Sequence, residues 1–109
     1  MNFNLLYTSN FEKEVKKLSK KYKSLKNDLD TLFDELEAEG TIGTSIGNNC
    51  YKIRVAITSK GKGKSGGARL ITHVFIVKKE IYLLSIYDKS EKENISEKEL
   101  NKLLESIQK

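Results

Sequence analysis

The side chains best suited to chemistry on a phosphate group are concentrated in the middle of the sequence. Residues 40–79 contain eight lysines and arginines and no carboxylate, whereas residues 1–39 sum to a charge of −1 and residues 80–109 to −2. A solvated face that favours solubility explains the net charge of +5 but not its confinement to one segment. A surface that binds a polyanion explains both, and nucleic acid is the commonest such partner. The basic residues of the segment are Lys52, Arg54, Lys60, Lys62, Lys64, Arg69, Lys78 and Lys79.

A glycine-lysine loop occupies residues 60–67 of this segment. Its Gly63-Lys64-Ser65 stretch is like the end of a P-loop, but Thr58 stands where that motif needs glycine, and strand sequence follows instead of a helix. The glycines would let the loop approach a sugar–phosphate backbone whose charge the lysines neutralise. A flexible hairpin loop with lysines that prevent aggregation is an equally good interpretation. The candidate RNA-binding residues here are Lys60, Lys62 and Lys64.

Composition predicts one soluble domain over residues 1–109. The chain is 38% hydrophobic and 32% charged, and no apolar run approaches the roughly 20 residues that span a bilayer. The first residues also lack the pattern of a signal peptide, so we expect a cytoplasmic protein. Cys50 and His73 are the only residues of their types, which excludes an internal disulfide and metal sites built on several cysteines or histidines. We expect no cofactor.

The first third of the chain predicts a strand and a helical hairpin. Apolar residues alternate over 3–7, and from residue 11 onward they recur at steps of three and four. One helix over 10–39 would be about 45 Å long, which exceeds the width of a domain of this size. We therefore expect a break at which Ser24 caps a second helix, a capping box at Ser9–Glu12, and a stop at Gly40. A coiled-coil seam is the alternative, but the pattern lasts too few heptads to favour it.

The rest of the chain predicts a loop, three strands and a helix. The loop covers 41–49, the strands cover 50–58, 68–77 and 81–87, a hairpin turn covers 78–80, and a capping box at Ser96–Glu99 opens the last helix. The resulting order, β-α-α-β-β-β-α, is an α+β fold with an antiparallel four-stranded sheet and the helical hairpin on one face. The pattern does not fix the place of the first strand. Apolar alternation puts Lys52, Arg54 and Arg69 together on the uncovered face.

Four stretches of this sequence resemble the RelE/ParE superfamily of toxins from bacterial type II toxin–antitoxin systems. They are Cys50–Arg54, Gly67–Ile71 and Leu84–Lys89, together with Gly63–Arg69, which is most similar to the HigB-like branch. The resemblance covers essentially the whole chain, and its motifs are specific only when taken jointly.

The resemblance implies an endoribonuclease that cuts messenger RNA in the ribosomal decoding site without a metal. The implied partners are the ribosome, messenger RNA and a cognate antitoxin that silences the toxin in a hetero-oligomer, and no membrane is involved. The 2′-OH of RNA supplies the nucleophile, so the protein need only move protons and stabilise the charge on the phosphate.

Site residues follow from the resemblance position by position. Lys52 and Arg54 match the basic pair on the second strand, and Arg69 matches an arginine that stabilises the phosphate. Lys89 falls near a basic residue that assists the leaving group. A lysine acting as base requires neighbouring cations that favour its neutral form. The arginines could instead pair with Asp88 or Glu80 across strands.

The sequence departs from the family near its end. Relatives often place an essential tyrosine or histidine there, and residues 90–109 contain neither. Tyr87 or His73 could substitute, although tyrosines and lone histidines on strands are more often ordinary packing residues. Two other functions stay open: a basic RNA-binding module without chemistry, and a ParE-like gyrase inhibitor on the same fold.

Overall fold

The computed structural model describes residues 2–107 as three α-helices and one five-stranded sheet. The elements in chain order are β1 (Asn4–Tyr7), α1 (Ser9–Lys21), α2 (Leu25–Glu39), β2 (Thr44–Gly47), β3 (Cys50–Val55), β4 (Ala68–Phe75), β5 (Glu80–Asp88) and α3 (Glu97–Glu105). Two short 3₁₀ turns, Thr58–Lys60 and Ile76–Lys78, follow β3 and β4.

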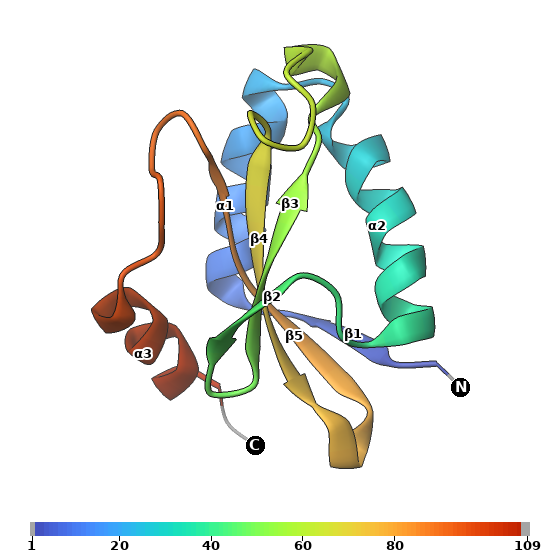
Figure 1. Ribbon diagram of the computed structural model, residues 1–109, viewed down its shortest axis with the longest axis vertical. Helices are drawn as coiled ribbons and strands as arrows, with labels where there is room; N and C mark the ends of the chain where they lie inside the picture. Colours follow the sequence, from blue (N-terminus) through green and yellow to red (C-terminus); the bar gives the residue numbers. More distant parts are fainter. Residues whose placement is uncertain (1, 108–109) are drawn as a thin grey trace.

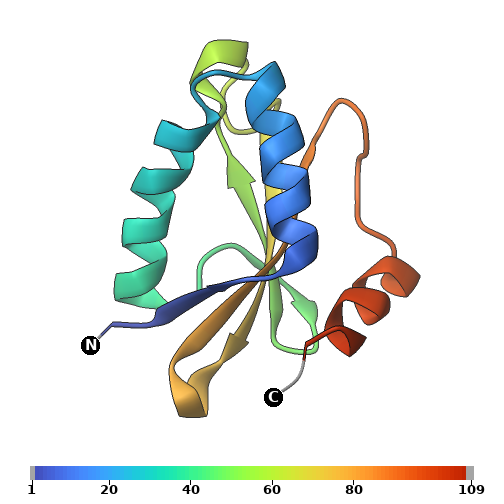
Figure 2. The ribbon, with the colours of Figure 1, turned by 180° about the vertical axis from the view of Figure 1, so that it is seen from behind.

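The sheet has the order β1-β5-β4-β3-β2, with α1 and α2 side by side on one face (Figures 1 and 2). The α+β class and the helical hairpin are as predicted. The predicted sheet was wrong in strand number and in being wholly antiparallel, because β1 joins its edge parallel to β5 while the other pairs are antiparallel. A parallel pairing needs a long crossover, and the helical hairpin with the following strands provides it.

The extra strand, β2, lies in the segment 41–49 that was predicted as loop. It pairs with β3 through a tight turn in which Asn48 and Asn49 adopt φ angles of 54° and 59°. Two central residues with positive φ are typical of the turn that joins the strands of a hairpin, and asparagine tolerates that conformation well. The Asn-Asn pair was the sequence signal for this hairpin turn, but the strand before it is polar and does not show the apolar alternation that predicts a strand.

Strands β3 and β4 end earlier than predicted, at Val55 and Phe75 instead of residues 58 and 77. The chain turns into the 3₁₀ segments there, and Lys79 closes the second one with a φ of 53°. Apolar residues continue beyond both strand ends, at Ile57 and at Ile76 and Val77, so the pattern did not mark the ends.

The helical hairpin breaks where predicted, but its caps differ in detail. Helix α1 is capped by Thr8, whose hydroxyl accepts the N–H of Phe11 at 3.2 Å, so the predicted capping box at Ser9–Glu12 is wrong. Ser24 stands at the start of α2 but does not cap a helix N–H. Its hydroxyl donates to Asp28 at 2.8 Å. Gly40 ends α2 with a φ of 81°, and a side chain there would collide with the ring of Phe3.

Apolar side chains pack on both faces of the sheet. The larger core joins α1 and α2 to the face that carries Ile53 and Leu70. On the other face, Leu100 of α3 packs against Ile71 and Leu84. The predicted capping box at Ser96 is present and opens α3. Helix α3 therefore covers part of the face that was expected to be bare, and the remainder is left for the basic side chains (Figure 1).

Within residues 2–107, no helix has the length and apolar character needed to cross a membrane.

Candidate functional site

Three polar side chains form one row across the middle of the sheet. Arg54 of β3 is the register partner of Arg69 of β4, and Arg69 is the register partner of Tyr87 of β5. Neighbours in such a row lie about 5 Å apart at their β-carbons, and like charges directly opposite each other destabilise a sheet. The pairing of two arginines therefore costs stability and needs an explanation in function. The row lies on the face opposite α1 and α2, because Ile53 and Val55 point into the larger core.

The guanidinium of Arg69 is held by the end of the glycine-lysine loop. Its NH1 donates to the carbonyls of Lys64 and Ala68 at 3.0 Å each, and its NH2 donates to the carbonyl of Ser65 at 3.0 Å. Arg69 is only 4% exposed. Carbonyl oxygens orient the group without neutralising its charge, so Arg69 is a fixed cation beneath the surface.

Arg54 differs, since its side chain is exposed and makes no hydrogen bond or ion pair with any residue in 2–107 that the structure describes. The two arginines thus combine an anchored charge with an available one. Neither pairs with Asp88 or Glu80, the alternative that the sequence left open.

Two lysines of the predicted site lie on the segments around this row. Lys52, two residues before Arg54 on the same strand face, donates to Asn94 Oδ1 at 3.0 Å. Lys89 follows Tyr87 and pairs with Glu93 at 3.6 Å, while its backbone N–H donates to the Gly67 carbonyl. Asn94 was not identified from sequence, because only the fold brings the segment after β5 next to β3.

Tyr87 combines a buried ring with a hydroxyl that has no satisfied hydrogen bond. The ammonium of Lys92 lies 4.9 Å from the ring centroid, a cation–π contact that sequence reasoning missed. The backbone of Ile95 lies near the hydroxyl, yet no group in the described chain meets hydrogen-bond geometry with it. Burial raises the pKa of Tyr87, and the Ile95 backbone and the charge of Arg69 offset this only in part. The hydroxyl therefore stays protonated at neutral pH, with its oxygen buried at the end of the row.

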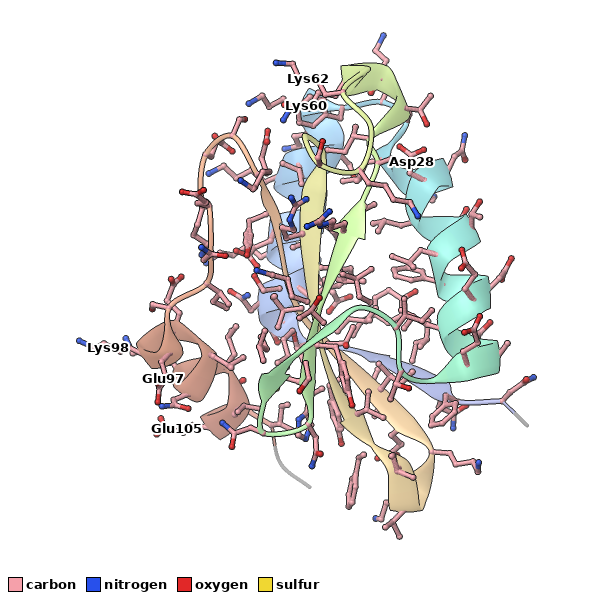
Figure 3. The ribbon with its side chains drawn as sticks, viewed as in Figure 1. Asp28, Lys60, Lys62, Glu97, Lys98 and Glu105 are labelled. Carbon is pink, nitrogen blue, oxygen red and sulfur yellow. The ribbon has the colours of Figure 1, made fainter. Side chains whose placement is uncertain are left out.

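The beginning of the glycine-lysine loop is tethered by two carboxylates. Lys60 donates to Asp88 at 2.7 Å, and Thr58 donates to Asp28 through its backbone N–H at 2.9 Å and its hydroxyl at 2.6 Å. The ammonium of Lys60 is thereby neutralised within the protein. Lys62 is exposed at the same end of the molecule, opposite the β4–β5 hairpin (Figure 3).

Asp88 is the centre of this anchor and is fully buried at its side chain. Besides Lys60 it accepts from the Tyr22 hydroxyl at 2.6 Å and from Ser90 through both its N–H and its hydroxyl. Burial alone would raise the pKa of Asp88, but the hydrogen bonds from Lys60, Tyr22 and Ser90 outweigh it and hold the pKa well below its usual range.

His73 lies on the same strand as Arg69 but apart from the row. Four residues of strand separate the two, or about 13 Å. His73 is 4% exposed, its Nδ1 lies 3.6 Å from the sulfur of Cys50, and its ring is tilted against Tyr82. It is thus placed with the core beneath α3.

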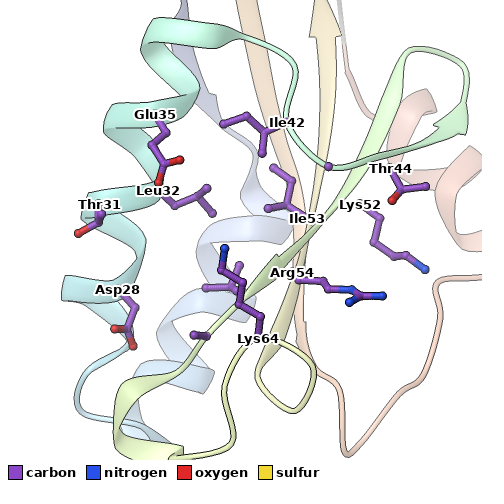
Figure 4. Close-up of a pocket in the computed structure, with 13 residues that line it drawn as sticks. Asp28, Thr31, Leu32, Glu35, Ile42, Thr44, Lys52, Ile53, Arg54 and Lys64 are labelled. Carbon is purple, nitrogen blue, oxygen red and sulfur yellow. The ribbon is translucent and has the colours of Figure 1, made fainter.

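A pocket of about 500 Å³ lies between β3 and α2 (Figure 4). Lys64 reaches across β3 toward α2, whereas Lys52 and Arg54 extend away from it, and Glu35 faces the opening from α2 (Figure 4). All three basic residues nevertheless line the pocket.

Residues 2–107 contain no group of three or more His, Cys, Asp or Glu side chains placed to hold a metal ion.

Together, the helical hairpin, the five-stranded sheet and α3 define a small α+β protein with a row of basic side chains on one face of its sheet. The family model for the RelE toxin of the RelE/RelB toxin–antitoxin system matches residues 7–108. The chain belongs to this RelE toxin family. Its fold is similar to that of a mutant of the E. coli toxin RelE in the free state, with a TM-score of 0.64, 18% identity, and coverage of 99% of this chain and 100% of that one. The RelE/ParE resemblance is confirmed, while the HigB-like branch stays a prediction.

Proposed function

We propose that this toxin is an endoribonuclease that cuts messenger RNA on the ribosome and is silenced by a cognate antitoxin. The observation that carries the proposal is the row of Arg54, Arg69 and Tyr87. Two arginines side by side with no carboxylate in contact favour a phosphodiester between them, because they stabilise the second negative charge that develops on its oxygens in the transition state. A protonated hydroxyl completes the row. Membership of a toxin–antitoxin family supports the antitoxin partner.

The reaction uses the RNA as its own nucleophile. A base removes the proton of the 2′-OH, O2′ attacks the phosphorus, the bond to O5′ breaks, and O5′ receives a proton. The products are a 2′,3′-cyclic phosphate and a 5′-hydroxyl. Arg54 and Arg69 stabilise the charge that develops on the phosphate oxygens.

The proton transfers fall to the side chains around the arginines. We assign the base to Lys52 and the proton donor to Tyr87, with Lys89 supporting the leaving group. His73 is too far along β4 to act in the same step, and Lys60 is neutralised by Asp88, so Lys62 and Lys64 are the loop lysines that bind RNA.

The experiment compares Arg54→Ala with Lys98→Ala, a control on the exposed surface of α3 (Figure 3). Arg54 is exposed and without a partner in the described chain, so its loss leaves the fold intact. With programmed ribosomes and purified protein, loss of one charge-stabilising group predicts a cleavage rate lower by about 100-fold to 1,000-fold. Lys98→Ala retains the full rate. Equal rates for the two variants would refute the site.

The same preparations distinguish the alternative functions. An RNA-binding module would bind ribosomes and leave the messenger intact in both variants. A gyrase inhibitor would arrest DNA supercoiling and leave the messenger intact.

A further inference from the structure

The two helices of the hairpin carry opposite charges, which the near-zero sum of residues 1–39 conceals. Helix α1 contains five lysines and two glutamates, whereas α2 contains one lysine and six carboxylates. The cationic character of the molecule is thus not confined to residues 40–79. It includes one helix on the face away from the arginine row.

The lysines of α1 form a continuous exposed stripe at spacings of three and four residues. Like charges at these spacings repel each other and destabilise a helix. Of these lysines, only Lys21 has carboxylates of the described residues within ion-pair distance, namely Asp88 at 3.6 Å and Glu91 at 4.0 Å. A solubilising surface would alternate its charges, so the uncompensated stripe indicates an anionic partner. The stripe consists of Lys13, Lys16, Lys17, Lys20 and Lys21.

This stripe borders a groove along the open end of β5. Strand β1 pairs with β5 only as far as Leu83, and beyond it Glu14 of α1 accepts from the Ser85 hydroxyl at 2.6 Å and the Ile86 N–H at 3.3 Å. The groove measures about 530 Å³. Four lysines of the stripe line it together with Glu14, Glu91 and the chain from Ile86 to Asp88; these lysines are Lys13, Lys17, Lys20 and Lys21. It therefore reaches Tyr87, where the arginine row ends.

We propose that the lysine stripe of α1 binds the sugar–phosphate backbone of a structured, double-helical RNA that lies beside the strand being cut. Lysines neutralise phosphates without reading bases, and A-form RNA is recognised largely through its backbone. The only aromatic residue of α1 is Phe11, which is buried, so the helix offers no platform for stacking the bases of a single strand. The inference rests on the proposed function, because the RNA at the arginine row is the strand being cut.

The test measures binding of a blunt-ended RNA duplex by fluorescence anisotropy over a series of KCl concentrations. Each phosphate-binding lysine contributes about one to the slope of log affinity against log salt, so Lys13→Gln/Lys17→Gln/Lys20→Gln is expected to reduce the slope by about three. The matched control, Lys26→Gln/Lys78→Gln/Lys98→Gln, removes the same charge from exposed positions elsewhere and is expected to keep the wild-type slope. Equal slopes for the two triple variants, or no duplex binding by the wild-type protein, would overturn the inference.

A second comparison separates this inference from the proposed function. Arg54→Ala is expected to lose cleavage while its duplex slope stays that of the wild type. If the wild-type protein cuts no messenger on ribosomes, the proposed function fails, and the duplex slopes still decide the role of α1. If the α1 variant loses affinity for an acidic antitoxin and not for the duplex, the stripe is a protein interface and the inference is wrong.

Discussion

Replacement of Asp88 by asparagine should destabilise the protein more than any change at an exposed carboxylate. The Asp88 side chain is fully buried, and Lys60, only 10% exposed at its side chain, would keep its charge without a counterion. Removing one partner of a buried ion pair costs about 3–5 kcal/mol. We expect about 3 kcal/mol for Asp88→Asn, because the amide still accepts one hydrogen bond at the carboxylate position. That is a large part of the stability of about 5–15 kcal/mol typical of a domain.

The assay is urea unfolding followed by circular dichroism at several pH values. With a slope of about 1.5 kcal/mol/M, the loss lowers the midpoint by about 2 M at neutral pH. Because the folded-state pKa of Asp88 lies below its unfolded value, its contribution is fully present above about pH 4 and disappears as the pH falls further. The difference between wild type and Asp88→Asn should therefore narrow in acid.

Asp34→Asn is the matched control, since this aspartate is exposed on α2 and should change stability by less than about 0.5 kcal/mol. A loss below about 1 kcal/mol for Asp88→Asn, or a difference that stays constant from neutral pH to pH 3, would refute the account of the anchor.

Three further substitutions test the site and the layers that hold it. Tyr87→Phe removes a buried hydroxyl with no satisfied hydrogen bond, so urea unfolding should show unchanged or slightly greater stability. The rate of messenger cleavage should fall at least about 10-fold. A stable variant with full activity would remove Tyr87 from the mechanism. Leu100→Ala truncates the residue that α3 buries against the sheet and should lower the free energy of unfolding, measured in urea, by about 2–4 kcal/mol. A loss of less than about 1 kcal/mol would contradict the packing of α3. Gly67→Ala places a methyl group against the Val55 carbonyl and should lower the free energy of unfolding by about 1–3 kcal/mol. Ser65→Ala, in the exposed part of the same loop, should change it little. Equal losses for the two variants would contradict the close approach of Gly67 to β3.

Local patterns predicted those elements whose signals are local. The helical hairpin, its stop at Gly40 and the capping box at Ser96 follow from periodicity and capping chemistry, and the structure has them. The parallel pairing of β1 with β5 depends on contacts distant in sequence, and no local signal specifies such contacts. Strand β2 does pair with its neighbour in sequence, but its polar residues do not show the apolar alternation typical of a strand.

The sequence predicted which basic residues form the site and on which face of the sheet they lie, but not the contacts that hold them. Apolar alternation placed Arg54 and Arg69 on one face, and the register then made them direct neighbours. The carbonyl cradle of Arg69 and the neutralisation of Lys60 by Asp88 could not be predicted. Both depend on how a glycine-rich loop folds back on its own strand, and glycine leaves that conformation undetermined.

The charge of the helical hairpin shows a different limit. The formal charge of residues 1–39 sums to −1, because the positive charge of α1 and the negative charge of α2 cancel within that range. Only the division into two helices made the lysine stripe visible.

The chemistry at the arginine row is tested most directly by the ends of the RNA that the wild-type protein leaves on programmed ribosomes. Attack by the 2′-OH, stabilised by Arg54 and Arg69, predicts fragments with a 2′,3′-cyclic phosphate and a 5′-hydroxyl. Fragments ending in a 3′-hydroxyl and a 5′-phosphate would show that water attacked the phosphorus, and would contradict the mechanism.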